Sequence, residues 1–383
     1  MKNHQVVSGL DRLDSAESLL RGRRVGLITN HSGLDRVFNS TVDLIYKKYQ
    51  LTALIAPEHG IRGDIQAGED VPAYRDSETG IMVYSAYTSK SRTLTEEMLD
   101  SFDVLVYDIQ DVGVRFYTYL YSLANAMTAC ALAGKPLLVL DRPNPLGGVI
   151  MLGTVIQEGF QSFVGDYALP TRYGLTAAEY ARYVRDYLHL DMDLHWVKMQ
   201  GWERGMLMDR TGLPWVPPSP NLPHFSAVLC YVGTCIFEGT NLSEGRGTPL
   251  PFEQIGAPWL DTRSLEWEMN RLALPGVMFR KTSFVPSFSK HQGKLCRGVQ
   301  LHVTDSRVFD AFKAGLLMME IIQRMHTEEF AYISWSKGTM PALDRLLGTD
   351  DFREGRLTAQ ELILKHAPLV RLFQETVAKY FLY

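Results

Sequence analysis

The residues best suited to chemistry follow an apolar run from Leu51 to Ala56, which predicts a buried β-strand. Glu58 and His59 come directly after this run, in the stretch LTALIAPEHGIRGDIQAGED. The glycine-rich segment beyond them has no apolar periodicity, so we expect no helix there for Glu58 to cap. A carboxyl and an imidazole at the tip of a buried strand suit general acid–base catalysis. The same stretch adds further ionisable side chains: Arg62, Asp64, Glu69 and Asp70.

Polar side chains also follow the other long apolar runs. In an open parallel sheet the carboxyl ends of the strands meet at one edge, where ligands bind. Each Asp or Asn at such a position could simply cap the next helix, but their coincidence at one edge favours a functional site. The side chains concerned are Asn30 and His31 after the first run, Asp108, Asp111 and Arg115 after the fourth, and Asp141, Arg142 and Asn144 after the fifth.

Two further segments combine acids, bases and amides. The motif YDIQDVGVRFYTYLYSL adds Tyr117 to Asp108, Asp111 and Arg115 at the start of a predicted helix, whose N-terminus favours negative charge. A structural Asp–Arg pair is the alternative interpretation. The motif EGTNLSEGRGTPLPFEQIGAPW lies on a glycine-rich loop, which is either a linker or a segment that closes over the same cleft. It supplies Glu238, Asn241, Glu244 and Arg246.

The elements that must position these residues alternate along the first half of the chain. Continuously apolar strands separated by helices, the clearest at 116–134, predict an α/β fold with a Rossmann-like, doubly wound and mainly parallel sheet. The proline-rich break GLPWVPPSPNLP predicts a junction, giving a Rossmann-like catalytic domain at 1–222 and a smaller α+β domain at 223–383 that closes the cleft. In the second domain we expect β-structure at 228–240 and 298–305, a helix at 306–326, and two helices beyond 341.

Composition excludes several classes of protein. The chain of 383 residues has a net charge of −4 and no strongly basic stretch, which disfavours a nucleic-acid partner. No apolar stretch reaches about 18 residues, so membrane insertion is not expected. The N-terminus has no apolar signal-peptide core, which predicts a cytoplasmic protein or an exported one whose leader has been removed. The four cysteines have no metal-binding spacing, and nothing in the sequence indicates an oligomeric state.

Common cofactor and catalytic motifs are absent from the sequence. It contains no GxxxxGK[ST] loop, no GxGxxG after the first strand, no GxSxG and no HExxH. Glu58 and His59 could ligate a divalent metal, but adjacent residues rarely both reach one ion. We therefore expect neither a metal nor a cofactor.

Five motifs, in order along the chain, resemble the NamZ-type (YbbC-like) exo-β-N-acetylmuramidase family of bacterial cell-wall metabolism. They are RRVGLITNHSGLD, APEHGIRGDIQAGE, YDIQDVGVRFYTYLYSL, LDRPNPLGG and EGTNLSEGRGTPLPFEQIGAPW. The resemblance implies an active site between a Rossmann-like domain and a smaller one. It also implies cofactor-free hydrolysis that releases N-acetylmuramic acid (MurNAc) from the non-reducing end of peptidoglycan fragments.

Within this interpretation Glu58 is the expected general acid, and His59 orients it or holds a sugar hydroxyl. The second carboxylate stays open among Asp108, Asp111, Glu69, Glu238 and Glu244, and the sugar's own 2-acetamido group could be the nucleophile instead. An arginine is expected to bind the lactyl carboxylate of MurNAc. The candidates are Arg62, Arg115 and Arg246, and Asn30, Tyr117, Asn144 and Asn241 are further candidate substrate-binding residues. The rival functions are a non-catalytic muropeptide-binding protein and a metal-dependent hydrolase.

Overall fold

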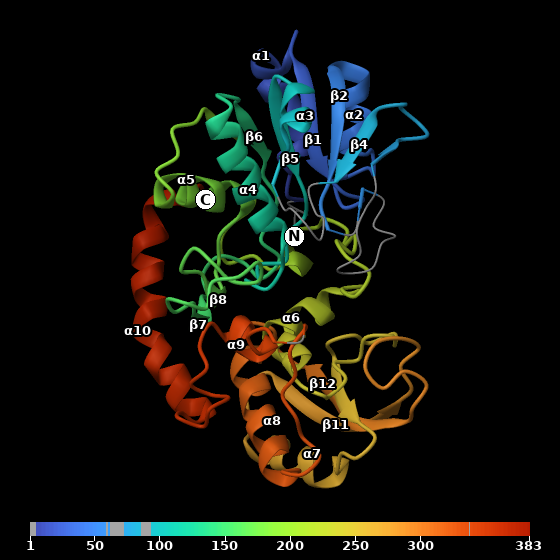
Figure 1. Cartoon of the computed structure of the whole chain (residues 1–383), viewed down its shortest axis with the longest axis vertical. Coiled ribbons are helices and arrows are strands. Elements are labelled where there is room, and N and C mark those ends of the chain that lie inside the picture. The colour runs from blue at the N-terminus through green and yellow to red at the C-terminus, as the bar shows by residue number, and fades with distance from the viewer. Residues whose placement is uncertain (1–4, 59, 62–72, 86–92, 337) are drawn as a thin grey trace.

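The computed structural model describes residues 5–58, 60–61, 73–85, 93–336 and 338–383. Figure 1 shows a larger α/β domain and a smaller α+β domain stacked along the long axis, with α6 between them. The predictions that concern His59, Arg62, Asp64, Glu69 and Asp70 lie outside the described residues.

The sheet of the larger domain contains seven strands among the described residues, in the order β3-β4-β2-β1-β5-β6-β9. All neighbouring strands are parallel except β3, which pairs antiparallel with β4 at the edge. The order reverses between β1 and β5, which is the topological switch point of a doubly wound sheet. The strands are β1 (Arg24–Thr29), β2 (Gln50–Ala56), β3 (Tyr74–Arg75), β4 (Met82–Ser85), β5 (Val104–Asp108), β6 (Leu137–Leu140) and β9 (Leu194–Val197).

Helices cover both faces of this sheet, which is why its central strands are continuously apolar. One face packs against η1 (Leu10–Ala16), α1 (Glu17–Leu20) and α2 (Thr41–Lys48). The other packs against α3 (Glu96–Asp100), α4 (Tyr119–Leu132) and α5 (Ala177–Tyr187). In β5 every residue is buried. The predicted Rossmann-like fold is confirmed, and the carboxyl ends of β1, β2, β5 and β6 do meet at one edge.

The smaller domain is built on a three-stranded antiparallel sheet in the order β10-β12-β11. Its strands are β10 (Gln254–Ala257), β11 (Val277–Phe284) and β12 (Cys296–Val303). Its helices are α6 (Phe225–Thr234), η3 (Cys235–Gly239), α7 (Thr262–Arg271), α8 (Ala311–Met325), α9 (Ala342–Leu347) and α10 (Ala359–Val377). Between the two sheets lie the short pair β7 (Leu152–Val155) and β8 (Pro170–Arg172), and η2 (Met208–Arg210).

The prediction of β-structure at 228–240 is wrong, because this segment forms α6 and η3. Its valine, threonine and cysteine side chains favour strands in isolation, but α6 packs directly on α8. A Cβ added at Gly233 would lie 1.7 Å from the carbonyl oxygen of Ala311, and one at Gly315 would lie 2.1 Å from that of Gly233. This close backbone approach of two helices overrides the local strand preference.

The end of the chain returns to the larger domain. Helix α10, red in Figure 1, runs along one side of the molecule and leads into η4 (Ala378–Tyr380). The hydroxyl of Tyr383 donates to Asp141 Oδ2 at 2.8 Å, and the backbone N–H of Leu382 donates to Glu179 Oε1 at 2.8 Å. The predicted division at residue 222 stays a prediction. In the described part of the chain, no helix has the length and apolarity needed to cross a membrane.

Candidate active site

Glu58 lies just beyond the carboxyl end of β2 and is almost fully buried, with 9% of its surface exposed. The hydroxyl of Thr118 donates a 2.5 Å hydrogen bond to its Oε2. Thr118 is the residue immediately before α4, so the carboxyl of Glu58 lies at a helix N-terminus, where the aligned peptide dipoles favour negative charge. The sheet edge and the helix start together fix the position of this acid.

A row of aromatic side chains leads from Glu58 to the smaller domain. The hydroxyl of Tyr119 receives a hydrogen bond from Asn30 Nδ2 (2.9 Å) and donates to the carbonyl of Pro218 (2.8 Å). Burial raises the pKa of Tyr119, and the nearby charge of Glu58 raises it further. The ring of Tyr117 packs edge-on against Tyr119 at 4.7 Å and against Tyr231 of α6 at 6.5 Å. All three rings are buried, with 8% of Tyr117, 1% of Tyr119 and 6% of Tyr231 exposed, so they pack the two domains together beside Glu58.

Four charged side chains of the smaller domain form an ion-pair cluster beside Tyr231. We call Glu238, Glu244, Arg246 and Lys290 the charged cluster. Arg246 Nη2 lies 2.6 Å from Glu238 Oε1 and its Nε 3.3 Å from Glu244 Oε1, while Lys290 Nζ lies 2.7 Å from Glu244 Oε2. Burial by itself lowers the pKa of Arg246, but the two carboxylates outweigh it and raise the pKa above its usual value. The guanidinium therefore keeps its charge.

Asp108, a predicted catalytic candidate, is engaged by other side chains of the protein. Its side chain is fully buried and forms a bidentate pair with Arg142, at 2.5 Å to Nε and 2.8 Å to Nη2. The hydroxyl of Thr41 donates to its Oδ2 as well. With both oxygens occupied, this carboxylate ties the ends of β5 and β6 together.

Arg115 forms no ion pair with an aspartate in the described part of the chain, and its predicted contact with substrate stays a prediction. Its side chain is 1% exposed, and its N–H groups donate to the backbone carbonyls of Thr154, Leu169 and Leu346. Burial lowers its pKa to about 10. It joins the β7–β8 pair to α9.

The three predicted amide ligands are also engaged with the chain itself. Asn30 accepts from the backbone N–H and hydroxyl of Ser32, in addition to its bond to Tyr119. Asn144 bonds the backbone of Leu175 and Leu146. Asn241 bonds the backbone of residues 329 and 331. These amides shape the loops around the site, and the structure does not present Asn144 or Asn241 to it.

Asp111 is the predicted acid with the most perturbed surroundings. Its Oδ2 accepts from the hydroxyl of Tyr173 and from the backbone N–H of Gly113 (2.7 Å), while its buried Oδ1 has no partner. Burial raises its pKa to about 6, although the two hydrogen bonds to Oδ2 oppose the shift. A buried carboxyl that titrates near neutral pH is either an acid–base group or a source of pH-dependent stability.

Replacing Asp111 by Asn tests this directly. The folded-state pKa lies above the unfolded value, so the wild type is stabilised below about pH 4 and loses that stability as the pH rises through about 6. The Asn variant keeps an acceptor for Gly113 and Tyr173 but cannot ionise. We expect the free energy of unfolding of the wild type, relative to the variant, to fall by roughly 3 kcal/mol at most between pH 4 and pH 7.

Urea unfolding at several pH values measures this difference, with the exposed Asp209→Asn as a control that should show none. A flat difference between wild type and Asp111→Asn would contradict the raised pKa. An intact structure with abolished turnover would instead mark Asp111 as a catalytic group.

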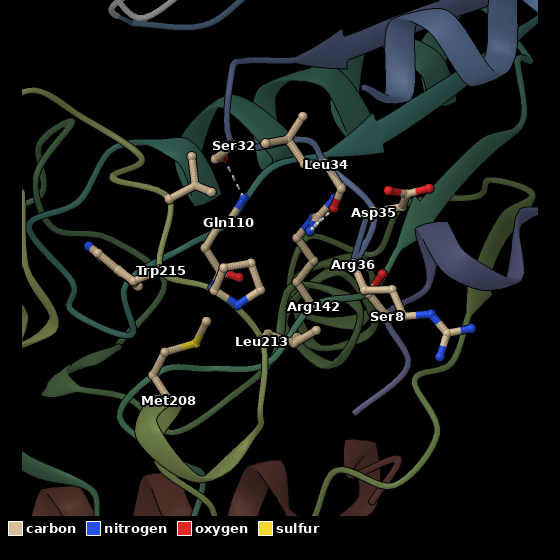
Figure 2. A pocket seen from close by; sticks show the side chains of 12 residues that line it. Ser8, Ser32, Leu34, Asp35, Arg36, Gln110, Arg142, Met208, Leu213 and Trp215 are labelled. Carbon is tan, nitrogen blue, oxygen red and sulfur yellow. Dashed lines mark hydrogen bonds between the residues drawn. The ribbon is translucent and has the colours of Figure 1, made fainter. Parts of the chain in front are cut away.

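The crevice at the switch point between β1 and β5 is largely filled by the chain itself. Its lining includes Met208, Leu213, Trp215, Gln110 and Arg142 (Figure 2). This pocket is about 30 Å³, enough for only a few waters. Dinucleotides bind at this position in related sheets, and this pocket between described residues is too small for one. Among the described residues, no three His, Cys, Asp or Glu side chains gather in a way that could hold a metal ion.

Sequence reasoning missed several residues that the structure brings to the site. Thr118 and Tyr119 lie inside the motif YDIQDVGVRFYTYLYSL. They lie close to Glu58 only because β2 pairs with β1 in the centre of the sheet. Lys290 lies 44 residues after Arg246, and no local motif points to it. Tyr231 lies seven residues before Glu238, in the segment that was predicted to be β-structure. Only the packing of the β11–β12 loop and of α6 places them there.

A buried acid at the sheet edge, an aromatic row and a charged cluster from a second domain form the kind of site that glycoside hydrolases use to bind and protonate a sugar. Comparison with known proteins agrees with this class. The N-terminal model of exo-β-N-acetylmuramidase NamZ matches residues 25–226, and the C-terminal model matches residues 229–383. The chain therefore belongs to the NamZ exo-β-N-acetylmuramidase family, as its five motifs predicted.

Individual relatives support the same assignment. The peptidoglycan β-N-acetylmuramidase NamZ of Bacillus subtilis is 44% identical over 100% of this chain and 92% of that protein. Two crystal structures of DUF1343 family proteins from Bacteroides fragilis share the fold, each covering 99% of both chains. Their TM-scores are 0.91 and 0.78, and their sequence identities are 35% and 29%.

Proposed function

We propose that this protein is a glycosidase that releases MurNAc from the non-reducing end of peptidoglycan fragments without a cofactor. The observation that carries the proposal is the position of Glu58, which is buried at the carboxyl edge of the sheet and hydrogen-bonded by Thr118 at the start of α4. Membership of the NamZ family supplies the substrate class.

In the proposed mechanism Glu58 gives its proton to the glycosidic oxygen as the bond from that oxygen to C1 breaks. Among the candidate second carboxylates, Asp108 is held by Arg142, while Glu238 and Glu244 are held by Arg246 and Lys290. Asp111 remains a candidate second carboxylate, and Glu69 lies outside the described residues. In the alternative that we adopt here, the sugar's 2-acetamido oxygen is the nucleophile that attacks C1. Water then adds to C1, giving its proton back to Glu58 and restoring the acetamido group.

The decisive experiment is incubation of the purified protein with a chromogenic MurNAc glycoside, with and without EDTA. The proposal expects release of MurNAc at the same rate in both. Binding without turnover would favour a muropeptide-binding protein, and a rate abolished by EDTA would favour a metal-dependent hydrolase.

Arg246 is the described arginine best placed to bind the lactyl carboxylate of MurNAc. The two carboxylates hold its Nε and Nη2, while its Nη1 has no hydrogen-bond partner among the described residues. We expect Arg246→Met to lower kcat/KM for a MurNAc glycoside. The expected loss of transition-state stabilisation is about 1.5–3 kcal/mol, the scale of a charge-assisted hydrogen bond. Activity on the matching N-acetylglucosamine (GlcNAc) glycoside should change much less, because that sugar has no lactyl group.

Steady-state kinetics on the two glycosides measure this selectivity, and Arg263→Met, an exposed arginine of α7, is the matched control. An equal loss on both sugars would mean that Arg246 supports the structure and does not read the lactyl group. The cellular compartment is a separate proposal: the protein is either cytoplasmic or exported with its leader removed, and fractionation of cells would distinguish the two.

A further inference from the structure

Lys290 belongs to the loop between β11 and β12 and reaches across to the loop that carries Arg246. Its Nζ lies 2.7 Å from Glu244 Oε2 and donates to the carbonyl oxygens of Phe237 (2.7 Å) and Thr240 (3.0 Å). The ammonium group therefore makes two hydrogen bonds to backbone carbonyls and one ion pair with Glu244. These contacts hold the side chain against the loop that carries Arg246.

The backbone on both sides of Lys290 is strained. Ser289 and His291 have φ angles of 69° and 58°, in the left-handed region that residues other than glycine rarely adopt. The ring Nε2 of His291 lies 2.7 Å from the carbonyl oxygen of Asn241 and helps to hold this conformation. Lys290 is thus flanked on both sides by strained residues, which indicates that the surrounding contacts hold its ammonium group in a fixed position.

The charges around Arg246 show what the placement achieves. With Glu238 and Glu244 alone, the guanidinium would sit between two carboxylates, and the group as a whole would repel an anionic ligand. Lys290 offsets the charge of Glu244, so the charged cluster has two cations and two anions. Arg246 then keeps enough positive potential at Nη1 to attract a carboxylate.

We infer that Lys290 is a specificity-determining residue, because its ammonium group neutralises Glu244 and thereby leaves Arg246 able to bind the carboxylate of an anionic sugar. Lys290 acts through Arg246 and does not touch the sugar. The inference rests on the proposed function, since it assigns the lactyl carboxylate of MurNAc to Arg246.

The test compares Lys290→Met, Lys290→Arg and the double variant Glu244→Gln/Lys290→Met on paired MurNAc and GlcNAc glycosides. We expect Lys290→Met to raise KM for the MurNAc glycoside by about tenfold, with kcat and the GlcNAc reaction nearly unchanged. Lys290→Arg keeps the positive charge, so its KM for the MurNAc glycoside should rise less than that of Lys290→Met. Lys294→Met, an exposed lysine of the same loop, should behave as wild type.

The double variant separates charge balance from mere support of the loop. Replacing Glu244 by Gln removes the anion that Lys290 offsets but keeps an acceptor for Arg246, so MurNAc selectivity should return even though the carbonyl contacts of Lys290 are gone. The inference would be overturned if Lys290→Met left KM for the MurNAc glycoside unchanged or weakened the reactions of both glycosides equally. It would also be overturned if adding Glu244→Gln did not restore the selectivity for MurNAc. If Lys290→Met does not fold, the double variant and Lys290→Arg give the same comparison.

Failure of the proposed function is distinguishable from failure of this inference. If the wild type shows no turnover, the proposed glycosidase function is rejected. The role of Lys290 in binding an anionic sugar can then still be tested by measuring affinities. Calorimetric affinities for free MurNAc and GlcNAc then give the same comparison across the variants. A wild type that binds MurNAc no better than GlcNAc, or a preference that Lys290→Met leaves intact, would overturn the inference.

Discussion

Replacing Glu58 by Gln is expected to lower kcat by roughly 10² or more while leaving the fold intact, which is the usual scale for loss of a general acid. The amide keeps the shape of the side chain and an oxygen that accepts from Thr118, so the position at the start of α4 is preserved. What disappears is the proton for the leaving oxygen. The measurement is kcat on a MurNAc glycoside, together with the thermal unfolding midpoint.

The leaving group sharpens this test. The dinitrophenolate leaving group of a dinitrophenyl glycoside needs little protonation to depart. The fall in kcat of Glu58→Gln should therefore be far smaller on this substrate than on one with a sugar or methylumbelliferyl leaving group. Glu97→Gln, an exposed glutamate of α3, is the matched control and should keep full activity. A loss of less than about tenfold with unchanged stability, or an equal loss on all leaving groups, would remove Glu58 from the role of acid.

Replacing Arg142 by Met is expected to have the largest effect on stability, lowering the free energy of unfolding by about 3–5 kcal/mol. The change leaves the fully buried carboxylate of Asp108 with the hydroxyl of Thr41 but without its cation. A buried charge that loses its partner costs far more than the intact pair contributes. Urea unfolding of the variant and the wild type measures the difference.

Two comparisons make this prediction specific. The half-exposed pair of Arg24 and Asp103 is screened by water, so Arg24→Met should shift the urea midpoint much less. The double variant Asp108→Asn/Arg142→Met has no unpaired charge and should recover part of the loss. If Arg142→Met unfolds at the same urea concentration as Arg24→Met, then Asp108 is not the buried structural carboxylate described here.

The sheet could be predicted because each strand carries its own signal. Runs such as residues 104–107 have no charged residue, which is typical of a parallel strand covered on both faces. The polar residue that follows each run, here Asp108, marks the sheet edge. Glu58 was singled out by the same local signal. By contrast, α6 was misassigned because its helical state depends on contact with α8 at Gly233 and Gly315, residues 82 positions apart in numbering.

The roles of the polar side chains could not be predicted, because their partners are distant in sequence. Arg115 was expected to bind an aspartate or a ligand, yet it bonds the carbonyl of Leu346, 231 residues away. Asp108 was a candidate catalyst, yet Arg142 occupies both of its oxygens. Nothing in the local spacing distinguishes a buried carboxylate with a partner from one that is open to substrate.

The sequence by itself determined the alternation of strands and helices in the larger domain, the edge at which the acids gather and, through five motifs, the family. These properties follow from the periodicity of apolar residues and from short contiguous patterns, which folding does not alter. The tertiary structure decided which charges pair, because pairing depends on distances between segments that only the packed chain brings together. It paired Asp108 with Arg142, engaged Arg115 with backbone carbonyls, placed Thr118 beside Glu58, and joined Lys290 to Glu244 and Arg246.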